Sequence, residues 1–405
     1  MKRFDPRIYL LTIGHFSIDW AQGAIPALLP YFISTCNLNY QEAGTLIFAN
    51  TLIASILQPV FGYYADRAAR PWFVPLGAFI SGISIALIPF LKQFWLLFLC
   101  AMLCGFGSAI YHPEAARMVN GLAGAQKGRA LGTFSVGGNA GLAAGPMFAG
   151  FCAYVAGIHF LMLYALFNTA AALFLHCCMP RLLQDMEAQK QGAPAKGETE
   201  NVQNDWPSFD KLTVLIFARS ICFSSCNAFI PLYFINVLKA SAAEGSMALT
   251  ILFGLGAVIT FFGGLLADRL GCVRVLRLAF FIMAPAMFLL VNSHSLSFAL
   301  AMLPIAGFAL FAPYSACVVL GQTYLAKNIG FASGVTLGLT TTFGGLATPL
   351  IGRAADQIGI GSALQILWMV AIIGVLFSFT LGSTASQAGK VSDPAKQQGH
   401  GLISR

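Results

Sequence analysis

The sequence predicts an all-α integral membrane protein with twelve transmembrane helices in two pseudo-symmetric halves of six. Hydrophobic residues make up 58% of the chain and charged residues only 9%, whereas soluble domains carry roughly 25% charged residues. The runs Leu131 to Pro180 and Leu278 to Ala326 contain no Asp, Glu, Lys or Arg, and each can hold two helices of about 20 residues. Alternating β-barrel patterning is absent, so we expect helices, which satisfy their own backbone hydrogen bonds in lipid.

Charges, prolines and polar clusters divide the chain into twelve predicted spans. They lie near residues 8–33, 43–64, 72–91, 94–118, 129–154, 158–178, 211–236, 245–269, 273–292, 295–320, 329–352 and 362–382. The first six form an N-terminal half (1–180) and the last six a C-terminal half (209–382). A linker (181–208) and a tail (383–405) are polar and low in aliphatic residues, so we expect the linker to be disordered or partly helical.

Lysine and arginine positions predict the orientation of the spans. Most of the 23 Lys and Arg residues fall on the side of the two termini and the linker, which predicts that this side is cytoplasmic. The exceptions are Lys92, Lys239 and Arg353 on the outer side and Arg219 inside a span. Topology thus accounts for the net charge of +8, and no nucleic-acid partner is expected. We predict a multi-pass protein of the bacterial cytoplasmic (inner) membrane.

No cleavable signal peptide is predicted, because the first apolar run contains His15 and Asp19 and lacks a small-residue cleavage site. The ten cysteines lie mostly within spans without paired metal-ligand spacing, which favours free, buried thiols and no metal site. The glycines of Gly132 to Gly150 are not followed by Gly-Lys-Ser/Thr, so no nucleotide site is predicted. We expect no cofactor.

The chain contains an internal repeat. GYYADR at 62–67 closes the second span, and GLLADR at 264–269 closes the eighth. The fifth span contains GGNAGLAAGP at 137–146, and the eleventh contains GGLATP at 344–349. A six-helix unit is therefore present twice, in parallel orientation because six spans return the chain to the same side. Parallel halves around a cavity at the membrane midplane are typical of transporters.

The repeated G-x-x-A-D-R run resembles the loop signature of the major facilitator superfamily. This resemblance implies the major facilitator fold, in which the aspartate and the cations after it pair across the cytoplasmic ends of neighbouring helices. A contact made only when the inner gate is shut would bias the conformational equilibrium. The gating residues so implied are Asp66, Arg67, Arg70, Asp268, Arg269 and Arg274. The alternative is a topology determinant with surface ion pairing.

Gly141, Gly145 and Pro146 resemble the fifth-helix motif of antiporters in the same superfamily. Small residues let helices approach closely and a proline kinks a helix, so the motif implies a kinked, tightly packed span. The alternative is packing alone.

A closer resemblance within the superfamily is to the fosmidomycin resistance proteins, which are proton-driven drug exporters. It rests on the pair His15 and Asp19, on QPVFGYYADR at 58–67, on YHPEAAR at 111–117, and on VGGNAG followed by Gly-Pro in the fifth span. The match is denser in the first half than in the second. It implies export of a small polar drug or metabolite in exchange for protons.

Ionisable residues inside spans are candidates for the transport site, because a charge at the bilayer centre costs roughly 2.5–3.5 kcal/mol. His15 and Asp19 are four residues apart and share one helix face. They lie roughly 10 and 16 Å into a core about 30 Å thick, and Arg219 lies roughly 14 Å into the seventh span. The seventh span is the repeat partner of the first, so we expect these opposite charges to face each other across the cavity.

The fourth span carries further polar residues. Glu114 either accepts protons or pairs with Arg117 three residues later, and His112 either lines the cavity or caps the turn before Pro113. We predict that Asp19, Glu114 and His15 couple protons. The predicted substrate-binding residues are His15, Asp19, Gln22, His112, Arg219 and Asn227.

The predicted function is secondary antiport with a small-molecule substrate and protons as partners in the lipid bilayer. A proton-coupled importer or facilitator of a small organic solute is the alternative with the same fold. An enzyme is not expected, because no extramembrane segment is long enough for a catalytic module and no nucleophile–base motif is present. A monomer is expected, since two halves complete a transporter.

Overall fold

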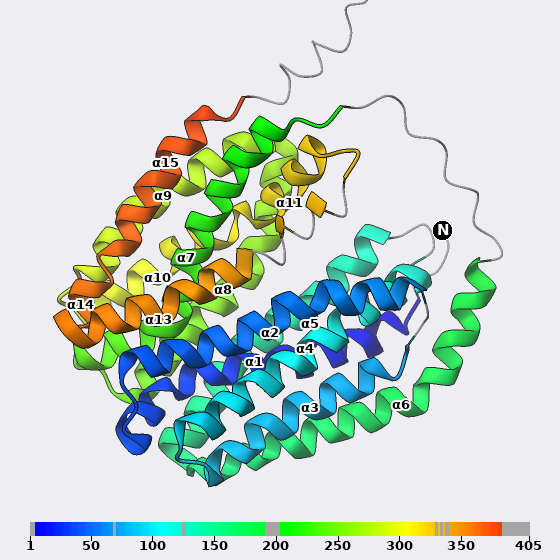
Figure 1. Ribbon diagram of the computed structural model, residues 1–405, viewed down its shortest axis with the longest axis horizontal. Helices are drawn as coiled ribbons and strands as arrows, with labels where there is room; N and C mark the ends of the chain where they lie inside the picture. Colours follow the sequence, from blue (N-terminus) through cyan, green and yellow to red (C-terminus); the bar gives the residue numbers. More distant parts are fainter. Residues whose placement is uncertain are drawn as a thin grey trace, which may run out of the picture.

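The computed structural model describes residues 5–67, 70–123, 127–190, 203–328, 331–332, 335–336 and 340–382, and these ranges contain helices and connections but no strand. The helices form two bundles side by side, one from each half of the chain (Figure 1). The all-α fold in two halves is thus as predicted. Membrane-spanning helices follow from the apolar composition, since a helix satisfies all its backbone groups internally.

The N-terminal bundle contains α1 (Ile8–Cys36), α2 (Tyr40–Arg67), α3 (Phe73–Leu87), η1 (Ile88–Phe90), α4 (Phe94–Leu122), α5 (Lys127–Phe151), η2 (Cys152–Ala156), η3 (Ile158–Leu161) and α6 (Met162–Lys190). The C-terminal bundle contains α7 (Trp206–Asn236), α8 (Ala242–Leu270), α9 (Cys272–Val291), α10 (Leu296–Phe311), α11 (Pro313–Tyr324), α13 (Thr340–Ile358), α14 (Ile360–Ala363) and α15 (Ile366–Thr380). Each of the twelve predicted spans coincides with one of these helices or a consecutive pair, over the residues that the structure describes.

Several boundaries differ from the sequence prediction by a few residues, and two differences are larger or change the number of helices. Helix α6 continues through Lys190, well beyond the predicted end of the sixth span near residue 178 and into the predicted linker. Most of its added residues are Met, Leu, Gln, Glu, Ala, Arg and Lys, which are good helix formers outside the bilayer as well. The tenth span divides into α10 and α11 around Ala312; proline at position 313 cannot donate to a preceding turn, but is well suited to the first turn of a new helix.

Nine described helices are long and apolar enough to cross a membrane, and the spans that fall short are α1, α5 and α13. These helices carry the polar and glycine-rich segments of the sequence, including GHFSIDW in α1 and GGNAGLAAG in α5. Helices α1 and α5 pack along each other, and α13 packs against α2 and α7. Most residues of α1 are buried inside the molecule, where lipid does not surround them.

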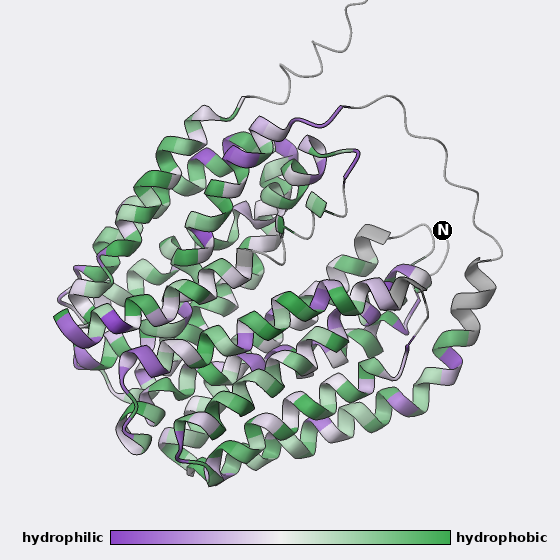
Figure 2. Ribbon diagram, in the orientation of Figure 1, coloured by the Kyte–Doolittle hydropathy of each residue, from purple (hydrophilic) through white to green (hydrophobic). Residues whose placement is uncertain are grey.

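Apolar side chains cover the outer surface. Large hydrophobic residues such as Leu166, Phe174, Phe281 and Leu376 are more than half exposed. Green, hydrophobic residues dominate the helices in Figure 2, and the purple, hydrophilic ones gather at the bundle ends. Such a surface needs lipid around it, because soluble monomers rarely expose apolar patches larger than a few hundred Å².

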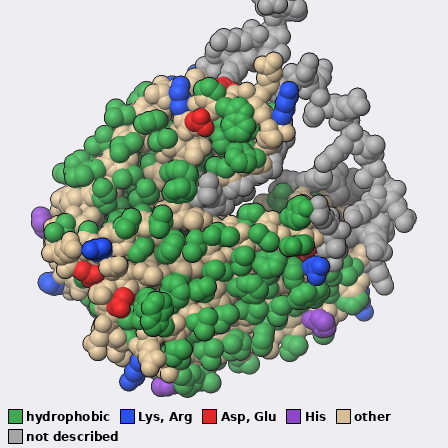
Figure 3. Space-filling model, viewed as in Figure 1, with side chains coloured by type: hydrophobic (Ala, Val, Ile, Leu, Met, Phe, Trp, Pro, Cys, Tyr) green, Lys and Arg blue, Asp and Glu red, His purple; other side chains and the backbone are tan. Residues whose placement is uncertain are grey.

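The halves touch each other at the end of the bundle that lies away from the termini, which we call the far end. There the backbone amides of Tyr40 and Gln41 in α2 donate to the Asp356 carboxylate of α13 at 2.8 and 2.9 Å. The Thr348 hydroxyl donates to the Gly44 carbonyl at 2.8 Å. Toward the termini the two bundles diverge (Figure 1), and the space-filling view is hollowed between them (Figure 3). The central cavity is therefore open on the side of the termini.

Candidate functional site

Three ionisable side chains meet inside the N-terminal bundle. His15 Nε2 lies 3.2 Å from Asp19 Oδ2, and His112 Nε2 lies 3.5 Å from Asp19 Oδ1. The two histidine Nε2 atoms are 3.1 Å apart. We call these three residues the His–Asp cluster. It brings together the predicted pair from α1 and one predicted substrate-binding residue from α4, 97 residues away.

Local sequence explains how the cluster forms. His15 and Asp19 are one helical turn apart on α1, so their side chains share one face. Gly138 of α5 lies against them, and a Cβ at this position would come within 2.6 Å of Asp19 Oδ2. Only glycine leaves room there for the cluster. The His15 ring also stacks on Phe134 of α5, with 4.1 Å between ring centroids.

The hydrogen bonds on the outer sides of the rings fix which nitrogens face inward. His15 Nδ1 donates to the Phe134 carbonyl at 2.8 Å, and His112 Nδ1 donates to the Ser108 carbonyl at 2.9 Å. A carbonyl oxygen only accepts, so the His15 bond requires a hydrogen on Nδ1. His112 Nδ1 also lies 3.0 Å from the Ser108 hydroxyl oxygen, which can either accept or donate. When both rings carry their hydrogen on Nδ1 and Asp19 is ionised, both Nε2 lone pairs and the carboxylate face one another as acceptors, and a proton or another cation would stabilise this arrangement.

The cluster is nearly enclosed, with one more accessible member. The side chains of His15 and Asp19 are each 11% exposed, and that of His112 is 23% exposed. Tyr111, next to His112, is fully buried and donates its hydroxyl to the Leu11 carbonyl of α1 at 2.6 Å. Access to the cluster is therefore greatest at His112, and α1 and α4 are held together beside it.

Arg219 of α7 occupies the corresponding helix of the C-terminal half but makes no ion pair within the described residues. Its Nε donates to the Leu310 carbonyl at 2.7 Å, and its guanidinium lies 5.4 Å from the ring centre of Tyr314 and 5.9 Å from that of Phe223. The predicted opposite charges therefore lie in the two halves without direct contact in this conformation.

Glu114 lies outside the His–Asp cluster, although it shares α4 with His112. It is fully buried, and its carboxylate accepts from Arg117 Nε at 3.2 Å and from a second guanidinium nitrogen of the same side chain. This is the ion pair that the i, i+3 spacing allowed. Its proton-coupling role stays a prediction.

The predicted neutral polar residues are Gln22 and Asn227, both partly buried. Asn227 Oδ1 is a buried oxygen that finds no hydrogen-bond partner among the described residues. Buried polar atoms are normally satisfied, so this carbonyl oxygen is free for a ligand or water. The substrate-binding roles of both residues stay predictions.

The predicted gating residues lie near the helix ends on the side of the termini. The side chains of Asp66 and Arg67 are outside the described residues. Arg70, Asp268, Arg269 and Arg274 are exposed, and over the described ranges none of these four is in an ion pair. Because the halves are separated at this end, the structure does not test contacts that belong to the closed gate.

The predicted antiporter motif packs directly on α1. Added Cβ atoms at Gly141 and Gly145 would come within 2.8 Å of the Trp20 backbone nitrogen and 2.6 Å of its carbonyl oxygen, respectively. Helix α5 continues through Pro146 to Phe151. Close packing, one of the two alternatives, is therefore present, and the role of a kink remains a prediction.

Asp356 is a functional candidate that the sequence analysis missed. It joins the halves at the far end, through the α2 amides described above. A signal was available, since GRAADQ at 352–357 is a third G-x-x-A-D run with glutamine in place of the final arginine. The joining of His112 to the pair on α1 has no comparable signal in the linear sequence.

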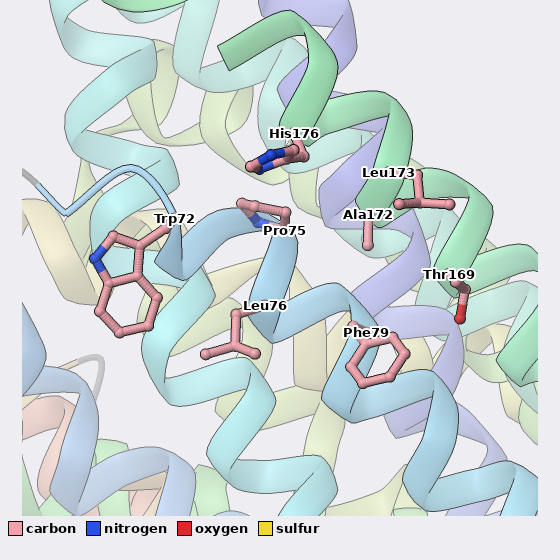
Figure 4. Close-up of a pocket in the computed structure, with 8 residues that line it drawn as sticks. All are labelled: Trp72, Pro75, Leu76, Phe79, Thr169, Ala172, Leu173 and His176. Atoms are coloured by element: carbon pink, nitrogen blue, oxygen red, sulfur yellow. The ribbon is translucent and has the colours of Figure 1, made fainter. Parts of the chain in front are cut away.

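A surface groove of about 360 Å³ lies between α3 and α6, away from the His–Asp cluster (Figure 4). Its lining is apolar apart from Thr169 and His176; the residues are Trp72, Pro75, Leu76, Phe79, Thr169, Ala172, Leu173 and His176. Phe79 and Leu173 are also among the exposed large hydrophobic residues. This groove belongs to the lipid-facing surface rather than to the transport site.

The two six-helix bundles around a central polar site define a membrane transporter. Residues 11–336 match the family model of the Major Facilitator Superfamily, and the chain belongs to this superfamily. It is a transporter of the membrane and not an enzyme.

Two bacterial proteins are similar to the chain over nearly its whole length. An uncharacterized transporter of the superfamily, YfnC of Bacillus subtilis (strain 168), is 28% identical over 376 residues, which cover 92% of this chain and 91% of that protein. The fosmidomycin resistance protein of Escherichia coli (strain K12) is 27% identical over 375 residues, or 91% of each chain. The resemblance stated from the sequence motifs is therefore confirmed.

A crystal structure with the same fold is that of a bacterial homolog of the human lysosomal transporter Spinster, in an inward-facing and occupied conformation. The TM-score is 0.78 at 17% identity, and the match covers 92% of this chain and 96% of that one. At this identity the likeness concerns the fold alone.

Proposed function

We propose that the protein is a proton-coupled antiporter that exports a small polar drug or metabolite across the bacterial cytoplasmic membrane. The observation that carries the proposal is the His–Asp cluster, in which three acceptor groups converge in a nearly enclosed site. Such a cluster is most stable with a bound proton. A membrane-embedded carboxylate with titratable neighbours is the usual form of a proton relay in transporters.

The conformation fits one stage of this cycle. With the termini cytoplasmic, as the lysine and arginine distribution predicts, the cavity faces the cytoplasm and the far end is closed toward the outside. In this state the cluster releases its proton inward, and substrate enters from the cytoplasm. Return to the outward-facing state carries substrate out, and Asp19 and His15 then take up a proton from the more acidic exterior.

Arg219 supplies the second part of the mechanism. It is a cation in the interior of the C-terminal half whose guanidinium is hydrogen-bonded only to a carbonyl among the described residues. A negatively charged or strongly polar substrate group is a suitable partner, because guanidinium donors match carboxylate and phosphate-like oxygens. Asn227, Gln22 and His112 add neutral polar contacts. For antiport, the proton and the substrate must compete for one state of the site or favour opposite-facing states.

Similarity to the fosmidomycin resistance protein supports the direction of transport and the substrate class. The alternative is import or facilitated uptake of a small organic solute with the same fold. The two are separated by the direction of the proton gradient that drives accumulation.

The test first identifies a substrate and then measures its coupling. Expression in a drug-sensitive bacterium, with fosmidomycin as the first compound of a panel, selects the compound whose toxicity is relieved. The chain is then reconstituted in vesicles for uptake of this compound. Antiport requires uptake into acid-loaded vesicles, whereas uptake driven by an acidic exterior indicates an importer.

The Asp19→Asn variant tests the cluster itself. We expect it to insert normally and to lose uptake driven by the proton gradient. Asp210→Asn is the matched control, because Asp210 is exposed near the start of α7 and the same chemical change there should leave coupling intact. Undiminished gradient-driven uptake by Asp19→Asn would exclude Asp19 as the proton carrier.

A further inference from the structure

The geometry of the His–Asp cluster points to a second ligand, and we propose that it binds a divalent transition-metal ion of the Zn²⁺ class. The ligands are His15 Nε2, His112 Nε2 and the Asp19 carboxylate. The inference goes beyond the proposed transport function, because metal binding here does not require that protons be transported.

The spacing of the donor atoms supports a metal site. Two ligands bound to zinc at about 2.0–2.2 Å with tetrahedral angles are roughly 3.3–3.6 Å apart. In the cluster, the His15–Asp19, His15–His112 and His112–Asp19 distances are 3.2, 3.1 and 3.5 Å. His15 approaches Asp19 Oδ2 and His112 approaches Asp19 Oδ1, and one ligand atom from each of the three residues lies within 4.8 Å of the other two. A rotation of the Asp19 carboxylate would bring one oxygen to a corner of the tetrahedron that the two Nε2 atoms share.

Both histidines also have the outer hydrogen bond that is usual for metal ligands. A histidine that binds a metal almost always donates its other ring N–H to a carbonyl or carboxylate, which fixes the ring orientation. Phe134 and Ser108 provide these carbonyls for His15 and His112. Because both Nδ1 atoms are occupied, the inward-facing Nε2 atoms are the ones available to an ion.

Charge and donor type define which ion fits. A divalent ion would be bound by two neutral imidazoles and one carboxylate, so it would bring the positive charge that three facing acceptors need. Imidazole and carboxylate ligands in a tetrahedral arrangement suit Zn²⁺ and, as a probe, Co²⁺, whereas Mg²⁺ and Ca²⁺ require six or more oxygen ligands. Three protein ligands leave a fourth position open, and the greater exposure of His112 gives that position access from the cavity.

The experiment is equilibrium metal binding to the purified full-length chain in detergent, freed of metal with a chelator. Co²⁺ is added and the intensity of its visible absorption bands is recorded, because tetrahedral Co²⁺ absorbs much more strongly than the octahedral aqueous ion. We expect one tightly bound Co²⁺ per chain, displaced by Zn²⁺ but not by a large excess of Mg²⁺. His15→Ala and His112→Ala should each weaken binding at least about tenfold.

Matched controls separate this site from other ligands in the chain. His176→Ala removes a histidine that lies in the groove between α3 and α6, and it should leave the affinity unchanged. The adjacent pair Cys177 and Cys178 is free and accessible, so the titration is repeated in a Cys177→Ser, Cys178→Ser chain with the same expected result. If an alanine variant fails to fold, His112→Gln, which keeps the side-chain size, decides the outcome.

The proposal is overturned if the wild-type chain binds no Co²⁺ in a tetrahedral environment, or if binding survives both His15→Ala and His112→Ala. Neither result affects the proposed function, which is measured with a chelator present in vesicles and depends on a proton gradient that the binding experiment lacks. Conversely, if the chain shows no proton coupling but still binds Co²⁺, the proposed function is contradicted and the metal-site proposal is supported.

Discussion

The two central helices α1 and α7 occupy equivalent positions in the repeated halves, yet they carry opposite chemistry. In α1, His15 and Asp19 join a histidine of α4 in a cluster that needs a cation. In α7, Arg219 is itself a cation, held by one carbonyl and two aromatic rings. Duplication of the fold therefore did not duplicate the site. In the proposed mechanism, the first half binds a proton and the second an anionic group.

The largest expected effect separates these two roles. Arg219→Ala should lower both gradient-driven uptake and substrate exchange at least about 30-fold, because truncating a partner in a buried charge pair costs 2 kcal/mol or more. Asp19→Asn should abolish gradient-driven uptake while exchange of substrate across the membrane continues, since exchange needs no proton turnover. Both assays use the same vesicles, and equal loss in both assays for both variants would contradict the division of roles.

A second prediction concerns the packing that permits the cluster in the first half. Gly138→Ala should destabilise the protein by about 1–3 kcal/mol through overpacking against His15 and Asp19, and it should reduce coupling as well. Thermal unfolding in detergent measures the change. Gly132→Ala in the same helix is the control, because an added Cβ there meets no atom within 4 Å; similar destabilisation by both variants would refute the steric explanation.

A third prediction concerns the contact between the halves at the far end. Asp356→Ala removes two hydrogen bonds from backbone amides to a charged carboxylate that is exposed to solvent. We expect a loss of about 1 kcal/mol for the conformation closed at the far end, or about a fivefold shift in population. Distances between spin labels on α2 and α13 report this shift, and an unchanged distribution would show that the contact does not stabilise closure.

The smallest expected effect concerns the residues just before the N-terminus of α1. The Asp5 carboxylate is partly buried, which by itself raises its pKa, but hydrogen bonds from Arg7 at 2.7, 2.8 and 2.9 Å outweigh burial and hold the pKa below its ordinary value of 3.8. A lowered pKa stabilises the folded state above pH 3.8 and loses this effect as the pH falls through the folded-state value. Asp5→Asn should therefore reduce stability by about 0.5 kcal/mol at pH 7 and by less at pH 3.

Unfolding of the wild-type chain and the Asp5→Asn variant over this pH range measures the difference. The start of α7 provides the comparison, because Asp205 there accepts from the Ser208 amide at 3.1 Å as a helix cap. A pH-independent difference between wild type and Asp5→Asn would show that the ion pair with Arg7 is not its cause.

Much of the fold could be predicted from the sequence, because the membrane imposes helices and fixes their length. Flanking charges identify spans that contain prolines and polar residues, such as α1, even though these spans are less apolar than the others. The sequence prediction ends the sixth span too early, because it relies on the loss of apolar residues. Gln, Glu and Ala are polar or small but have high helix propensity, so the helix continues beyond the membrane.

The site could be predicted only in part. The i, i+4 pair His15 and Asp19 follows from helix geometry alone, as does the possible pairing of Glu114 with Arg117. Contact with His112 depends on how α1, α4 and α5 cross, and that crossing is set by glycines such as Gly138 whose role is visible only in three dimensions. The environment of Arg219 depends in the same way on the break between α10 and α11.

The contact at the far end has an unequal tolerance to mutation. Asp356 contributes its side chain, whereas Gln41 contributes a main-chain amide that nearly every amino acid would supply equally well. Tyr40 contributes a main-chain amide and also its hydroxyl, which accepts from Asn236 Nδ2 of α7 at 2.9 Å. Substitutions at Gln41 should therefore keep the hydrogen bond to Asp356, with proline as the exception, because proline has no amide hydrogen to donate. Variation at this contact should consequently be tolerated at Gln41 and not at Asp356.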